Sequence, residues 1–108
     1  MYEVTPTEVV NLAWSGPAPP AYPRFPADQG LTAVAISTRE TVVSNDVARD
    51  PRYLTALAST GSELIAPVIV GDRVVGTLDV EDEATGAFSN DDRRLLELVA
   101  GELGPLYR

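Results

Sequence analysis

The sequence contains no cysteine, no histidine and no lysine, and its eight basic residues are all arginine. Without cysteine there is no thiolate nucleophile and no disulfide, and the usual nitrogen and sulfur ligands of zinc, iron and copper are missing. The lack of histidine removes the base of a serine or cysteine triad. The lack of lysine excludes a Schiff base and a Walker A phosphate loop. Any catalysis would have to use carboxylates, hydroxyls, tyrosine, arginine or a metal held by oxygen, and we expect no cofactor.

Length and charge narrow the class of protein further. The chain has 108 residues, a net charge of −8 and 44% hydrophobic residues, which predicts one folded domain over residues 1–108. A strongly acidic surface is repelled by phosphate backbones and anionic membranes, so we expect neither a nucleic acid nor a membrane as partner. No apolar run approaches the roughly 20 residues that span a bilayer, and the first residues do not resemble a secretion signal. The default expectation is a cytoplasmic protein.

Apolar and β-branched runs predict strands at residues 2–4, 9–14, 41–44, 63–70 and 73–80. The last two strands are joined by Gly71-Asp72 and form the clearest hairpin of the chain. Residues 15–26 are rich in proline, which fixes φ and lacks an amide donor, so this segment is expected to form a loop.

Helices are expected in three places. The first has its N-cap at Asp28, the second is a short turn from Pro51 through Leu57, and the third is capped by Ser89. The apolar stripe of the last helix consists of Leu95, Leu96, Val99, Leu103 and Leu106. Together with the strands, these helices predict an α+β fold, a central antiparallel sheet flanked by helices.

Several short segments occur in an order that is typical of one family. They are Gly30-Leu31-Thr32, Asp46-Val47, Asp50-Pro51-Arg52, Ser62-Glu63-Leu64-Ile65-Ala66-Pro67-Val68, Val75-Gly76-Thr77-Leu78-Asp79-Val80-Glu81 and Phe88-Ser89-Asn90-Asp91-Asp92. In this order they resemble the GAF domain family from about residue 24 to the end, and residues 2–14 are similar to its opening strands. The resemblance implies a GAF/PAS-like sheet with a small-molecule pocket between the sheet and the loops and short helices on one side.

The family resemblance also implies a helix ahead of the first strand, packed beside the last helix. The strand pattern of this sequence already begins at Tyr2, so we expect that first family helix to be missing. An apolar surface left open in this way favours association. We therefore expect a homodimer that forms through the C-terminal helix.

Within the family, the sequence is most similar to the free methionine-R-sulfoxide reductases. In that branch, acidic residues of a Ser-Glu-hydrophobic segment and of an Asp-x-Asp/Glu segment line the pocket, and Ser62-Glu63-Leu64 and Asp79-Val80-Glu81 match these segments. Asp79 and Glu81 are two positions apart, so they face the same side of a strand, and Glu63 begins the neighbouring strand. A cation such as a ligand ammonium group would neutralise the three carboxylates.

The reductases also use cysteines, and this sequence has none. The resemblance places the three thiol positions at or near Tyr22, Thr32 and Ala56. Tyrosine and threonine form neither a sulfenic acid nor a disulfide, so reduction of a sulfoxide by thiols should be lost. The expected ligand-binding residues are Glu63, Asp79, Glu81, Tyr22, Trp14 and Thr32.

The same residues have other interpretations. Glu63, Asp79 and Glu81 could be solvated at the ends of the hairpin and paired with Arg52 or Arg73. The aromatic residues near the proline-rich loop could form a wall around a ligand, with a cation–π face for an ammonium group, or could belong to the core. These aromatic residues are Trp14, Tyr22, Phe25 and Tyr53.

The favoured hypothesis is a non-catalytic sensor or regulatory domain that binds a small amine or an amino acid. The loop at 15–26 would become ordered over the ligand and shift a population of conformers or dimers. One alternative is an enzyme related to the free methionine-R-sulfoxide reductases. Another is a structural dimerisation module whose pocket is vestigial.

Overall fold

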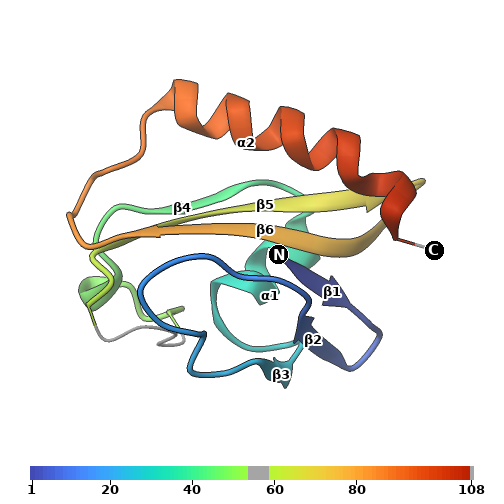
Figure 1. The fold of residues 1–108 in the computed structure, drawn as a ribbon, viewed down its shortest axis with the longest axis horizontal. Helices are drawn as coiled ribbons and strands as arrows, with labels where there is room; N and C mark the ends of the chain where they lie inside the picture. The colour runs from blue at the N-terminus through green and yellow to red at the C-terminus, as the bar shows by residue number, and fades with distance from the viewer. Residues whose placement is uncertain (54–58, 108) are drawn as a thin grey trace.

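The computed structural model describes residues 1–53 and 59–107 (Figure 1). The strands are β1 (Tyr2–Val4), β2 (Glu8–Asn11), β3 (Arg24–Pro26), β4 (Val42–Ser44), β5 (Ser62–Val70) and β6 (Arg73–Asp82). The α-helices are α1 (Gly30–Thr38) and α2 (Asn90–Leu103), and 3-10 turns lie at η1 (Val47–Arg49) and η2 (Gly104–Leu106).

The strands form one six-stranded antiparallel sheet in the order β3-β2-β1-β6-β5-β4. β5 and β6 are its longest strands, and the turn between them contains Gly71 with a φ of +65°, a conformation that glycine adopts without strain. β1 pairs with β6, and the Tyr107 hydroxyl donates a hydrogen bond of 2.8 Å to the Tyr2 carbonyl. The predicted α+β class with a central antiparallel sheet is confirmed.

A helix covers each face of the sheet, with α2 on one face and α1 on the other (Figure 1). The buried cluster under α2 consists of Ala66, Val68 and Ala100, with Leu96 and Leu103 packed against it. The buried cluster under α1 consists of Leu31, Ala35, Val42 and Ile65. Because side chains alternate along a strand, positions 63 and 65 of β5 face α1, whereas positions 66 and 68 face α2.

The prediction that Asp28 caps the first helix is wrong. The helix begins at Gly30, and its N-cap is Gln29, which makes no side-chain capping bond. The Gln29 N–H donates to the Pro26 carbonyl at 3.3 Å, and Gly30 has a φ of +75°. Because of this turn, Asp28 lies one residue before the N-cap. The Asp28 carboxylate therefore does not bond to the free amides of the first helical turn.

The strand predicted at 9–14 ends at Asn11 instead. Beyond that point the N–H groups of Leu12 and Ala13 both donate to the Met1 carbonyl, because β1 offers no further residue to pair with. Trp14 therefore lies in the loop. The loop predicted at 15–26 is shorter than expected, since its last residues form the edge strand β3, where a proline costs no interior ladder bond. Of the helical turn predicted from Pro51 through Leu57, residues 54–57 lie outside the described residues.

The apolar stripe predicted for the last helix is only partly buried. Leu96 and Leu103 pack on the sheet, but the side chains of Leu95, Val99 and Leu106 are exposed. The helix touches the sheet mainly through β5, and its buried residue is Ala100, which has a small side chain. The contact is therefore narrower than the stripe, and an apolar surface remains open to solvent.

The N-cap predicted at Ser89 is confirmed, and it forms a capping box. The Ser89 hydroxyl accepts from the Asp92 N–H at 3.2 Å, and the Ser89 N–H donates to the Asp92 carboxylate at 2.8 Å. We expect Ser89→Ala to lower the free energy of unfolding by about 1 kcal/mol in urea denaturation, because an amide of the first turn loses its acceptor. Ser15→Ala, in the exposed loop, is the control and should change it by less than about 0.5 kcal/mol. Equal effects of both substitutions would contradict this role of the cap.

Candidate functional site

The pairing of β5 with β6 brings three carboxylates together on the face that α1 covers. Glu63 lies directly opposite Glu81, and Ile65 lies opposite Asp79. Since side chains alternate along each strand, Glu63, Asp79 and Glu81 share one face of the hairpin. We call these three residues the acidic cluster. Like charges directly opposite one another destabilise a sheet, so the arrangement needs a compensating interaction.

Protonation of Glu63 supplies part of that compensation. Glu63 is only 6% exposed, and this burial, reinforced by the charges of Asp79 and Glu81, raises its pKa to about 9. At neutral pH Glu63 is therefore protonated and forms a hydrogen bond with Glu81. Burial also raises the pKa of Asp79 to about 6, although the Thr77 hydroxyl donates to it at 2.7 Å and opposes the rise.

Neutral hydroxyl groups complete the surroundings of the cluster. Glu81 Oε1 accepts hydrogen bonds from the Tyr53 hydroxyl at 3.3 Å and from the Thr60 hydroxyl at 3.2 Å. The Tyr2 hydroxyl lies close enough that its own burial and the three carboxylates raise its pKa. The cluster is thus surrounded mainly by neutral hydrogen-bond donors, and the Met1 ammonium group lies near enough to Asp79 to oppose the rise in the pKa of that carboxyl.

The interpretation that arginines neutralise the cluster is wrong for the described residues. Arg52 pairs with Asp50, with 2.7 Å between Nη2 and Oδ2, and this pair holds the pKa of Asp50 well below its usual range. Arg73 forms no ion pair with the cluster, because it stands at the far end of β6, beside the turn. The negative charge around Asp79 therefore has no arginine partner in this part of the chain.

Two cavities meet at Tyr2 and Asp79, and both residues line each of them. The outer cavity has a volume of about 390 Å³, and its wall includes Trp14, Glu81 and residues 15–18 of the proline-rich loop. The inner cavity has a volume of about 30 Å³, enough for about one water molecule or a methyl group. Its wall includes Tyr22, Thr32, Glu63, Phe25 and Tyr53.

Each of the six residues predicted to bind a ligand lines one of these cavities, and Asp79 lines both. Trp14 and Tyr22 remain about half exposed, at 51% and 47%, so neither is a core residue. Of the expected thiol positions, Tyr22 and Thr32 line the inner cavity, and Ala56 lies outside the described residues.

Sequence reasoning missed two residues of the site. Tyr2 was assigned only to a strand, but the pairing of β1 with β6 places it beside Thr77 and so close to Asp79. Thr60 bonds to Glu81, and the only signal for it was its position just before the segment that contains Glu63. Both depend on strand pairing, which the local pattern of residues does not show.

Within 1–53 and 59–107, no group of three or more acidic side chains is arranged to hold a metal ion. In the same ranges, no helix is both long enough and apolar enough to cross a membrane.

Comparison with known proteins gives the family. The sequence profile of the GAF domain matches residues 1–106. The chain belongs to the GAF domain family. The GAF domain is 24% identical to the free methionine-R-sulfoxide reductase of Escherichia coli K12 over 80 residues, which are 74% of this chain and 48% of that protein. It spans about half the length of the curated relatives that it matches.

Solved structures agree with this membership. The type II free methionine-R-sulfoxide reductase of Thermoplasma acidophilum has a TM-score of 0.91 and 26% identity, covering 98% of this chain and 74% of that one. The free methionine-R-sulfoxide reductase of Neisseria meningitidis, solved in complex with its substrate, has a TM-score of 0.89 and 27% identity. The match covers 98% of this chain and 64% of the Neisseria one. The GAF domain thus has the fold of these reductases.

The raised pKa of Glu63 makes stability depend on pH. A carboxyl whose pKa rises from 4.5 to about 9 on folding holds its proton more tightly in the folded state, so stability falls as pH rises between those values. Glu63→Gln keeps the shape and a hydrogen-bond donor but does not titrate. We expect the variant to match the parent near pH 5 and to exceed its free energy of unfolding by about 2–4 kcal/mol at pH 9.

Urea denaturation at several pH values checks this prediction. Glu102→Gln, on the exposed side of α2, is the control and should follow the parent at every pH. Stability curves of the parent and Glu63→Gln that stay parallel from pH 5 to pH 9 would show that Glu63 is not held protonated by the fold.

Proposed function

We propose that this GAF domain binds a small molecule with a protonated amine in the outer cavity and acts as a sensor or regulatory domain rather than as a catalyst. The observation that carries the proposal is that Asp79 and Glu81 line a cavity of about 390 Å³ whose described lining contains no arginine and one cationic group, the Met1 ammonium. Two partly buried carboxylates beside one ammonium group leave negative charge uncompensated, and a ligand ammonium group would neutralise it. The empty cavity would thus be the less stable state.

The surroundings of the acidic cluster support an amine more than another cation. Trp14 lines the same cavity and offers an aromatic face to a cation. The volume suits a molecule of the size of an amino acid rather than a bare ion, and its wall is formed partly by the proline-rich loop. Closure of that loop over a ligand would shift the population of conformers and provide the regulatory output.

The relatives support the same class of ligand. The reductases that this chain resembles are named for free methionine-R-sulfoxide, which is an amino acid with a cationic amino group, and the Neisseria protein was solved with its substrate bound. Residues 1–108 contain no cysteine, and a hydroxyl cannot replace a thiol in a cycle that passes through a disulfide. Binding without thiol-dependent reduction is therefore the function that we propose for this chain.

The ligand proposal is tested by thermal denaturation with leucinamide, which carries an amine, and with N-acetylleucinamide, which is neutral and otherwise matched. We expect leucinamide to raise the Tm by about 5–10 °C at saturation, because it binds only the folded state. Asp79→Asn should raise the leucinamide concentration that gives half of this Tm increase at least about tenfold, because a charged hydrogen bond is lost.

Glu102→Gln serves as the matched control variant, since its carboxylate lies on α2 and lines neither cavity. Its response to leucinamide should equal that of the parent. If leucinamide and N-acetylleucinamide stabilise the parent equally, or if Asp79→Asn responds like the parent, the acidic cluster does not bind amines.

A second proposal concerns α2, whose exposed apolar residues we assign to a homodimer interface. The side chains of Leu95 and Leu98 are 63% and 70% exposed, and Val99 and Leu106 are exposed beside them. Leu95 and Val99 also line an apolar groove of about 250 Å³ between α2 and the sheet, which would accept side chains of a second copy. A contiguous apolar surface of this kind is typical of interfaces between subunits.

Light scattering at tens of micromolar, an order-of-magnitude working range, tests the dimer. We expect a dimer for the parent and a monomer for Leu98→Glu, because the new charge would be buried in the interface. Leu12→Glu is the control, since Leu12 is 50% exposed but lies outside α2, and it should remain dimeric. A monomeric parent would rule out this interface.

A further inference from the structure

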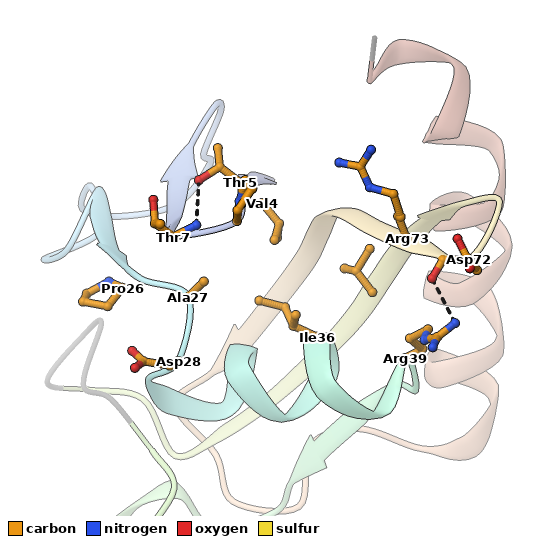
Figure 2. Close-up of a pocket in the computed structure, with 12 residues that line it drawn as sticks. Val4, Thr5, Thr7, Pro26, Ala27, Asp28, Ile36, Arg39, Asp72 and Arg73 are labelled. Atoms are coloured by element: carbon orange, nitrogen blue, oxygen red, sulfur yellow. Dashed lines mark hydrogen bonds between the residues drawn. The ribbon is translucent and has the colours of Figure 1, made fainter.

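Another concave surface lies along α1, away from the acidic cluster. It is an open groove of about 630 Å³ that shares no lining residue with the outer or inner cavity. Four segments form it: the turn between β1 and β2, residues 26–28 ahead of α1, the second half of α1, and the turn between β5 and β6. Figure 2 shows Arg39 and Arg73 beside the β5–β6 turn and Asp28 at the start of α1. We call this surface the arginine groove.

The distribution of ion pairs sets the two arginines of the groove apart. Among the described residues, five arginines lie within ion-pair distance of a carboxylate, namely Arg24, Arg49, Arg52, Arg93 and Arg94. Arg39 and Arg73 form no such pair in the described part of the chain, and both line the arginine groove. In a chain with 16 acidic and eight basic residues, unpaired arginines gathered at one surface are unexpected. Their positive charges are available to a ligand.

The backbone holds Arg39 at the edge of the groove. Arg39 is the C-cap of α1 and has a φ of +58°, a left-handed conformation that usually belongs to glycine or asparagine. Its N–H donates to the Ala35 carbonyl at 2.9 Å, and its guanidinium Nη1 donates to the Asp72 carbonyl, also at 2.9 Å. Because that bond goes to a carbonyl and not to a carboxylate, the positive charge is positioned without being neutralised.

The rest of the groove is apolar in its middle and acidic at the far end. Val4, Ile36 and Val74 contribute hydrophobic side chains between the arginines and Asp28. An anionic group is attracted to the two guanidinium groups of Arg39 and Arg73, which outnumber the single carboxylate at that end, Asp72, and it is repelled from the Asp28 end. An apolar body attached to it can cover the hydrophobic residues between the two ends. The groove has the charge pattern and the lining that an organic anion requires.

We propose that the arginine groove binds a small organic anion, a carboxylate or a phosphate monoester with an apolar body. The anionic group contacts the guanidinium groups of Arg39 and Arg73, and planar guanidinium groups suit both carboxylate and phosphate oxygens. The apolar body lies along Val4, Ile36 and Val74. This site is separate from the amine site that we propose at the acidic cluster.

Amide chemical-shift titrations by NMR with hexanoate, phenyl phosphate and hexanol test this proposal. Hexanoate should shift the amides of Val4, Ile36 and Val74 in a saturable manner, whereas hexanol, which lacks the charge, should not. Phenyl phosphate shows whether a phosphate monoester binds more tightly than a carboxylate. Arg73→Gln and Arg39→Gln should each weaken hexanoate binding about tenfold, because each removes a charge-assisted contact.

Arg94→Gln, on α2, is the matched control and should bind hexanoate like the parent. Absence of saturable shifts at Val4, Ile36 and Val74 with both anions would overturn the proposal. Equal shifts with hexanol, or unchanged affinity in the folded Arg73→Gln variant, would overturn it too. Asp79→Asn separates the two sites, since it should weaken the response to leucinamide and leave the response to hexanoate unchanged.

Discussion

The crowding of three carboxylates on the β5–β6 hairpin is the constraint on which the site depends. Cross-strand pairing places Glu63 against Glu81, and the alternation of the strand adds Asp79 to the same face. The fold tolerates this arrangement because Glu63 keeps a proton and the hydroxyls of Tyr53 and Thr60 donate to Glu81. With the Met1 ammonium group as its nearby cation, the cluster still has more negative than positive charge, and an amine ligand would supply the difference.

β1 and α1 connect this site with the arginine groove. Tyr2, at the start of β1, lines both cavities at the acidic cluster, whereas Val4 at its end lines the groove. Along α1, Thr32 faces the inner cavity and Ile36 faces the groove. Both β1 and α1 thus contribute residues to the acidic cluster's cavities and, further along the chain, to the arginine groove. Arg39 and Arg73 therefore line a different surface from Glu63, Asp79 and Glu81.

The fold and most of the site could be predicted from the sequence, because they depend on local patterns. Strand alternation predicted the hairpin and the shared face of Asp79 and Glu81, and the order of short segments indicated the GAF family. Features that depend on a single turn or on the pairing of distant segments could not be predicted from local patterns. The start of α1 depends on the turn at Gly30, and the pairing of β1 with β6, which places Tyr2 at the site, joins segments far apart in the sequence.

The protonation of Glu63 reports most directly on the charge of the acidic cluster beside the proposed site. It can be measured by NMR titration of the side-chain carboxyl carbon of Glu63 with and without leucinamide. A midpoint near pH 9 is expected in the free protein, moving toward the ordinary value of 4.5 when the amine binds, because an ammonium group favours the ionised form. A midpoint near 4.5 without ligand, or a high midpoint that saturating amine leaves unchanged, would contradict the role of the acidic cluster as an amine site.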